Sequence, residues 1–216
     1  MLISFSAVLV FIFLPVFDGK NTLDEVDDLF NRVSKSSSDK LEDIEEEAQE
    51  NVGTEVSFTA TADDAAQAER IVALMSDAGA QASAQDKKVD VSGDIGEIML
   101  AATDLSRQAF DNESMEVTAD KTGKEKPVPL YDWFTAIDTG QKDLQSAGEF
   151  DNQKLFLELS EKAIEPAYNY YGIEESSPSS EAIAITVALI GYVIYTLWYG
   201  FAILFMFEGY GIKLEH

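Results

Sequence analysis

The sequence predicts an α+β membrane protein in which two transmembrane helices, N-terminal and C-terminal, flank a βαββα(β) domain with an added helical hairpin. Three observations support this fold class. Both terminal stretches are apolar and almost free of charge. The middle carries nearly all of the 40 acidic and 15 basic residues. Within the middle, apolar residues recur either every second residue, as in strands, or every third to fourth residue, as in helices.

The charge balance limits the partners that the protein can bind. The chain has a net charge of −25, and among its acidic residues only Glu208 and Glu215 lie outside 18–181. Such a surface repels phosphate backbones and anionic lipid headgroups. We therefore expect no nucleic-acid partner.

The composition also limits the chemistry. The chain has no cysteine, and its one histidine belongs to Leu214-Glu215-His216, which resembles the start of a vector-encoded tag. Without His and Cys, the Ser-His-Asp and Cys-His nucleophile systems and the Cys/His zinc sites are excluded. The acidic runs at 24–28 and 42–50 lack EF-hand spacing and are interpreted as solvated helix faces. We predict that the protein is not an enzyme and has no catalytic residue, metal site or cofactor.

The segment 182–207 contains no charged side chain and predicts a transmembrane helix. At about 1.5 Å per residue, it is long enough to cross a hydrocarbon core of about 30 Å. Ser180 and Glu181 precede it as start signals, and Glu208 and Gly209 follow it as stop signals. The remainder, 208–216, is a short tail that includes the tag remnant.

This C-terminal helix carries the candidate functional residues. One polar face is interpreted either as a helix-packing face or as a pore lining: Tyr192, Tyr195, Thr196, Tyr199 and Glu208. A phenol at membrane depth needs a hydrogen-bond partner that lipid cannot supply. In an oligomer Glu208 would form a ring of carboxylates, as in cation-selective pores, unless it faces water at the interface. Small residues predict close helix packing: Ala184, Ala188, Gly191 and Gly200.

The segment 1–17 has no charged side chain and is interpreted as a short transmembrane helix. It lacks the basic start and the small-residue cleavage site of a signal peptide. Both termini are predicted to be cytoplasmic, because this places the amino group and Lys213 inside and the acidic domain outside the cytoplasm. We therefore expect an integral membrane protein with an extracytoplasmic central domain.

The range 18–53 predicts an acidic helical stalk. A Thr22-x-x-Glu25 capping box starts it, and the serines at 36–38 are expected to interrupt it. Its apolar side, which includes Phe30 and Ile44, predicts packing either on the domain or on a second copy.

The range 54–120 predicts a small α+β domain with its helices on one face of an antiparallel sheet. One helix is expected to be capped by Asp63 or Asp64 and to end at Gly79, and the second to be capped by Asp94. Strands are expected at 54–61, 80–84, 88–92 and, as an optional last strand, 114–119.

The range 121–129 predicts a linker, 130–171 a helical hairpin and 172–181 a second linker. Gly148 marks the turn of the hairpin, and Pro166 is expected to end or bend its second helix. Apolar side chains are expected to meet across the hairpin: Trp133, Phe134 and Ile137 on one side, and Leu155, Leu157, Leu159 and Ile164 on the other.

Two functions are compatible with these observations. The first is a membrane-anchored extracytoplasmic interaction or assembly module that self-associates, with the lipid bilayer and a further protein as partners. The second is a homo-oligomeric cation channel with an acidic outer vestibule and a pore lined by the C-terminal helix. The sequence names no ligand, ion or stoichiometry.

Overall fold

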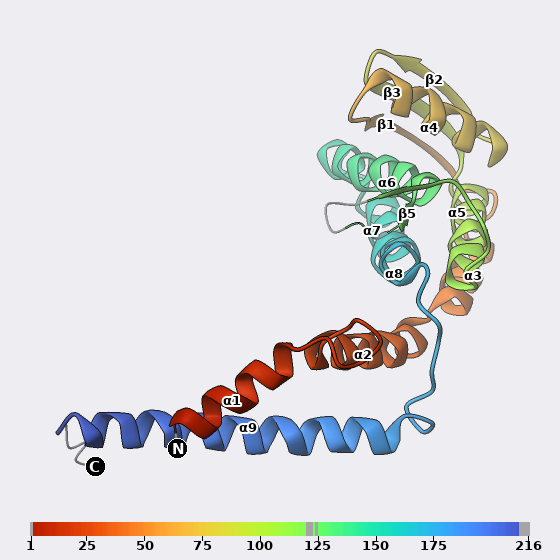
Figure 1. Ribbon diagram of the computed structural model, residues 1–216. Helices are drawn as coiled ribbons and strands as arrows, with labels where there is room; N and C mark the ends of the chain where they lie inside the picture. The colour runs from red at the N-terminus through yellow and green to blue at the C-terminus, as the bar shows by residue number, and fades with distance from the viewer. Residues whose placement is uncertain (1, 120–122, 124, 212–216) are drawn as a thin grey trace. The chain divides into compact units, whose positions relative to one another are not determined.

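The computed structural model describes residues 2–119, 123 and 125–211 (Figure 1). Contacts divide the chain into two compact units, one of Met1–Ser36 with Glu175–His216 and one of Ser37–Glu174. The predicted tag remnant at 214–216, Lys213 and the linker lysines Lys121 and Lys124 lie outside the described residues. Each unit is described by itself below.

The Ser37–Glu174 unit begins with the βαββα order that the sequence predicts, preceded by one helix. The elements are α3 (Leu41–Glu50), β1 (Glu55–Thr61), α4 (Ala65–Asp77), β2 (Gln81–Gln85), β3 (Lys88–Asp94) and α5 (Ile95–Phe110). Asp64 caps α4 by accepting a hydrogen bond from the Gln67 amide, and Asp94 caps α5 in the same way. These two caps confirm the predicted helix starts.

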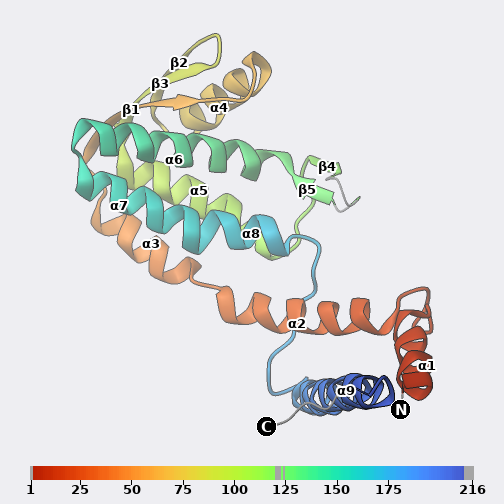
Figure 2. The same ribbon diagram turned by 90° about the vertical axis from the view of Figure 1, so that its left-hand side faces the viewer.

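The three strands form an antiparallel sheet in the order β1-β3-β2. Alternate residues of β1 and β3 are buried, with Val56, Phe58 and Val91 facing the core and Ser57 and Ser92 facing away. Helix α4 packs on the inner face, and the long helix α6 (Val128–Ala147) runs beside β1 (Figure 2).

The optional last strand does not join this sheet. The short strand β4 (Val117–Ala119) pairs instead with β5 (Glu125–Pro127) in a separate two-stranded sheet, so the predicted linker at 121–129 contains a strand. The reason is geometric. Helix α5 carries the chain about 24 Å along its axis before β4 begins, and Figure 2 shows the two sheets at opposite ends of the unit.

The predicted hairpin is formed by α6 and by a second helical stretch in three parts: α7 (Phe150–Leu159), a π-helical turn (Ser160–Ile164) and α8 (Glu165–Tyr170). Gly148 forms the turn with φ +83°, as predicted. Pro166 does not end the stretch, because it lies in the first turn of α8, directly after the π-helical turn. Because proline lacks an amide hydrogen, the wider turn just before it accommodates the missing hydrogen bond.

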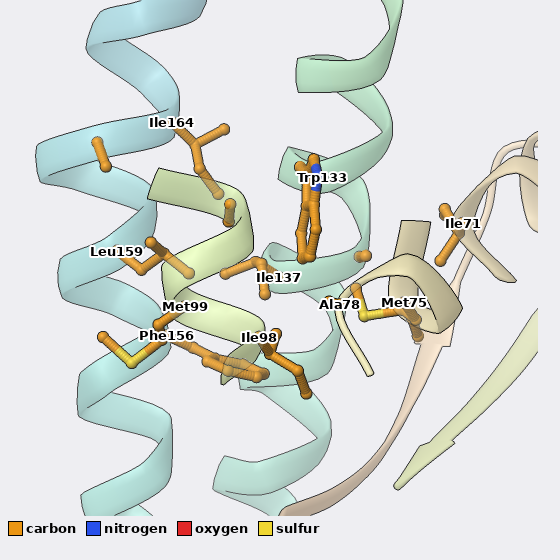
Figure 3. Close-up of a cluster of buried hydrophobic side chains, with 14 of the residues drawn as sticks. Ile71, Met75, Ala78, Ile98, Met99, Trp133, Ile137, Phe156, Leu159 and Ile164 are labelled. Atoms are coloured by element: carbon orange, nitrogen blue, oxygen red, sulfur yellow. The ribbon is translucent and has the colours of Figure 1, made fainter. Parts of the chain in front are cut away.

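The core lies between the hairpin, α5 and the sheet (Figure 3). Trp133, Ile137, Leu159 and Ile164 are buried as predicted, but Phe156, not Leu157, fills the centre. The Phe156 ring meets the Phe58 ring edge to face, with centroids 5.0 Å apart. Helix α3 belongs to the same core, because Leu41, Ile44 and Ala48 are buried in it. The apolar side of this part of the predicted stalk therefore packs on the domain.

The described residues of the other unit form the helices α1 (Leu2–Phe13), α2 (Thr22–Ser38) and α9 (Ala182–Gly209). Asn21, not Thr22, caps α2, because its side chain accepts from the Leu23 and Asp24 amides while Asp24 accepts from the Asn21 amide. The break between α2 and α3 falls at Asp39 and Lys40, just after the predicted serines.

Helix α9 has 28 residues and is, within the described part of the chain, the one helix long and apolar enough to cross a membrane. Helix α1 has only 12 residues, or about 18 Å, which is less than a hydrocarbon core of about 30 Å. Asp18 and Gly19 then form a tight turn in which Phe17 and Lys20 exchange backbone hydrogen bonds. The C-terminal span is a candidate on both length and composition; the N-terminal helix does not reach that length.

Candidate functional site

The outward side of the three-stranded sheet is a surface of small polar side chains, here called the polar face. The register places its residues in three rows: Ser57, Ser92 and Gln81; Thr59, Asp90 and Ser83; Thr61, Lys88 and Gln85. Hydrogen bonds cross the strands from Ser57 Oγ to Ser92 Oγ (3.0 Å) and from Thr59 Oγ1 to Asp90 (2.8 Å). These bonds order the side chains that a partner would meet.

The nine residues of these rows include one acidic and one basic side chain, Asp90 and Lys88. Two further carboxylates lie on this side of the sheet or beside it: Glu55 in the next row of β1, and Asp143 of α6. An open hollow of about 560 Å³ lies over this face, reaching from Ser57 and Asp143 to Gln81 and Ser83. Along β2, which carries no charged residue, the polar face offers hydroxyl and amide groups to a partner.

The two edges of the sheet differ. Along β1, helix α6 supplies the missing hydrogen-bond partners, because the Thr59 amide donates to Asp143 (2.8 Å) and the Thr61 amide donates to Thr139 Oγ1 (2.9 Å). Along β2, no described strand or helix side chain pairs with the outer edge. Proteins usually protect such an edge with charges, proline or a cover, and β2 has neither a charged residue nor a proline. The β2 edge is open.

An ion pair with a buried carboxylate holds α4 and α6 together behind the polar face. The Arg70 guanidinium donates two hydrogen bonds to the Asp132 carboxylate, at 2.6 and 2.9 Å, and the Asp132 side chain is only 2% exposed. The hydrogen bond with Asp132 raises the pKa of Arg70. Beside it, Gln67 Nε2 donates to Thr135 Oγ1. The sheet is thus fixed on a rigid helical support, which favours binding without reorganisation.

A second hydrogen bond ties the start of α4 to α6. The Tyr131 hydroxyl donates to the Asp63 carboxylate at 2.8 Å, and this bond is the main reason that the pKa of Tyr131 is raised. The Tyr131 ring also lies 6.2 Å from the Tyr168 ring of α8. The helices behind the sheet are therefore connected to one another as well as to α4.

The sequence-predicted tyrosines lie on α9, in the other unit. Phe5 of α1 is buried and contacts both Tyr195 and Tyr199, with ring centroids 5.6 Å apart in each case. Tyr192 is exposed, and the Thr196 hydroxyl donates to the Tyr192 carbonyl oxygen of its own helix. The contact with Phe5 favours helix packing over a pore lining for Tyr195 and Tyr199; the pore remains a prediction.

The remaining candidate residues of α9 stay accessible in the single chain. Glu208 is exposed near the helix end, and Ala184 is exposed while Ala188 is half-buried. A β-carbon on Gly191 or Gly200 would meet no atom within 4 Å. Close packing at these two glycines is therefore not made within the described part of the chain, and it stays a prediction for a contact between copies.

Sequence reasoning predicted the strands but not the polar face or the open edge. The signal available was the alternation of Ser, Thr and Asp with the apolar positions of β1 and β3, which marks a solvent-facing side without revealing which edge of the sheet is open. Which edge is covered depends on α6, which is distant in sequence from β1.

Within the described residues, no group of three or more His, Cys, Asp or Glu side chains is placed to hold a metal ion. Comparison of the chain with protein-family models, with curated proteins and with solved structures finds no match. The fold and the site therefore define a class of protein and not a family. The described residues form a mixed α+β chain with one candidate membrane-spanning helix and an open, uncharged sheet edge.

Proposed function

We propose that this protein is a membrane-anchored interaction and assembly module that associates with further copies of itself. The observation that carries the proposal is the contrast between the two sheet edges, one covered by α6 and one open and uncharged. Helix α9 supplies the anchor, since it is long and apolar enough to cross a bilayer. The function is to hold the sheet surface at the membrane, where it binds other copies.

The experiment that tests this function is the mass of the full-length protein in detergent, measured by light scattering or native mass spectrometry. We expect a particle of two or more copies, because an open neutral edge and the accessible glycines of α9 both favour association. A monomer at all concentrations up to about 100 µM would contradict the proposal.

We also propose that the Ser37–Glu174 unit lies outside the cytoplasm and that both termini lie inside, with 2–17 entering the bilayer beside α9. The acidity of the unit supports this orientation, because an inside-negative potential favours acidic segments outside. The contact of Phe5 with Tyr195 and Tyr199 supports the membrane location of α1, since it places this apolar helix on α9.

The orientation is tested with single cysteines, which are unique labels because the chain has no cysteine. In intact cells, a membrane-impermeant maleimide should label Ser146→Cys, at an exposed position of α6, at once. It should label Glu208→Cys only after permeabilisation. The reverse pattern would show that the proposed orientation is wrong, and labelling of both in intact cells would show that α9 does not span.

The alternative function, a homo-oligomeric cation channel, has one structural support, which is the exposure of Glu208 at the end of α9. It is the weaker proposal, because Phe5 contacts Tyr195 and Tyr199, two of the three tyrosines on the predicted pore face. A monomeric particle in the mass measurement would contradict it as well, since a single α9 encloses no water path. If the particle holds three or more copies, the Glu208→Gln variant tests the channel: its cation selectivity in liposomes should fall if Glu208 forms a carboxylate ring.

A further inference from the structure

The open edge of β2 presents a defined set of backbone groups. In β1 the amides of Thr59 and Thr61 point to α6. The backbone hydrogen bonds to β3 are therefore formed by the alternate residues of β1, such as Ala60. The β3 residues opposite Thr59 and Thr61 therefore turn their backbone groups to β2, where they meet Ser83 and Gln85. By the same alternation, the amides and carbonyls of Ala82 and Ala84 point outward along the free edge.

The hairpin gives the same assignment independently. The loop between β2 and β3 has two residues, Asp86 and Lys87, and Gln85 pairs with Lys88 directly across it. A two-residue loop closes on a hydrogen-bonded pair, so Gln85, Ser83 and Gln81 bond to β3. The backbone groups of Ala82 and Ala84 are therefore again the ones left to bond with an outside strand.

The sequence of β2 reads the same in both directions, Gln-Ala-Ser-Ala-Gln from Gln81 to Gln85. When such a strand meets a second copy of itself antiparallel, every residue can face an identical residue type. With Ser83 at the centre, Ala82 of one copy lies opposite Ala84 of the other, and these are the residues whose backbone groups point outward. The symmetry of the sequence and the outward direction of the Ala82 and Ala84 backbone groups therefore select the same register, centred on Ser83.

We infer that two copies of the chain pair through β2, antiparallel and centred on Ser83, to join their three-stranded sheets into one continuous sheet. Ala82 and Ala84 of each copy exchange backbone hydrogen bonds with Ala84 and Ala82 of the other. Ser83 faces Ser83 across a two-fold axis, and the polar faces of both copies continue on one side of the joined sheet.

The electrostatics of the edge permit this occupant. Two chains of charge −25 repel each other as wholes, but the facing pairs are Ala with Ala, Ser with Ser and Gln with Gln. No like charges are brought opposite each other at the contact. Charges elsewhere on the two domains are screened over a Debye length of about 10 Å at 0.1 M salt. The proposed membrane anchors keep both copies in one plane, which raises their effective concentration.

This inference rests on the proposed self-association and names the surface that carries it. It is tested first by crosslinking the full-length protein in detergent and in native membranes. Ser83→Cys should form a disulfide-linked dimer under mild oxidation, because facing residues of an antiparallel pair have β-carbons about 4.5–5.5 Å apart. The matched control is Ser57→Cys, on the same face but on the covered strand β1, where the two copies would be about 24 Å apart. We expect at least tenfold less dimer for the control.

A charge exchange then tests the two-fold axis. Ser83→Lys and Ser83→Glu each place like charges opposite each other, so each variant alone should associate at least tenfold more weakly than the wild type. Mixed in equal amounts, the two variants should form a Lys–Glu heterodimer and recover association. Because Ser83 is exposed, thermal unfolding of each variant should match the wild type at a concentration low enough for the wild type to be monomeric as well. Ser57→Lys serves as the control for an added charge on this face.

The outcomes separate this inference from the proposed function. An oligomeric wild type in which Ser83→Cys does not crosslink, or in which the Lys and Glu variants associate normally, overturns pairing through β2 and leaves self-association standing. Association that is lost in both variants but not recovered on mixing overturns the register centred on Ser83. A monomeric wild type contradicts both the function and the pairing.

Discussion

Replacing Gly96 by alanine is expected to lower the stability of the Ser37–Glu174 unit by about 3 kcal/mol, or about 10 °C in the unfolding midpoint. Gly96 lies in the first turn of α5, where the end of α3 crosses it. A β-carbon at this position would lie 2.5 Å from the Val52 amide nitrogen and 2.6 Å from the Ala48 carbonyl oxygen. Both are backbone atoms, so no side-chain rotation relieves the overlap, and α3 must move away from α5.

The measurement is thermal unfolding of the full-length protein in detergent, followed by circular dichroism. Two other glycines give graded controls. Gly140→Ala would meet the Phe58 ring, a side chain that can shift, and should therefore lose less stability. Gly191→Ala on α9 has open space and should leave the midpoint of the unit unchanged. A Gly96→Ala midpoint within about 2 °C of the wild type would mean that α3 does not pack against α5 as described.

Replacing Arg70 by methionine is expected to destabilise the same unit by about 2–3 kcal/mol. The Asp132 carboxylate has 2% exposure, and without the guanidinium it would stay buried without its charged partner. Breaking a buried pair in this way costs about 3–5 kcal/mol. The expected loss is smaller here because the Arg70 side chain is 44% exposed, so water can enter the space that it leaves.

The control is Lys142→Met, which removes the partner of Asp138 in an ion pair whose lysine is 63% exposed. Its expected loss is below about 1 kcal/mol. The double variant Arg70→Met and Asp132→Leu should recover most of the stability, because it removes the buried charge as well as its partner. Equal losses in Arg70→Met and Lys142→Met would show that the Arg70 pair contributes no more than a surface pair.

Local chemistry predicted much of the fold. Asp64 and Asp94 were identifiable as caps because an acidic side chain stood directly before a helical apolar pattern, and Gly148 as a turn because helices end readily at a left-handed glycine. The α9 helix was predictable from its uncharged length. Each of these features is decided within a few residues of sequence or by composition.

The errors arose where distant elements compete. Phe156 and Leu157 are adjacent and both apolar, so the sequence does not show which of them is buried. The orientation of α7 against Phe58 decides that Phe156 is the buried one. The strand β4 was predicted correctly, but its partner β5 was not predicted. Strand pairing depends on the position of the chain at the end of α5, which the sequence does not show. The cap of α2 is Asn21 and not Thr22, because the Asn21 side chain accepts hydrogen bonds from two backbone amides. Spacing alone does not distinguish these two adjacent capping residues.

The sequence by itself determined an acidic mixed α+β chain with an apolar helix at 182–207, because charge, hydropathy and apolar period are properties of single segments. It also contained the symmetric strand Gln81–Gln85, although nothing in the strand alone says that it lies at an edge. Only the tertiary structure decided that α6 covers β1 and leaves β2 open. The physical reason is that an edge becomes free or covered through contacts between residues far apart in the chain, such as Thr59 and Asp143.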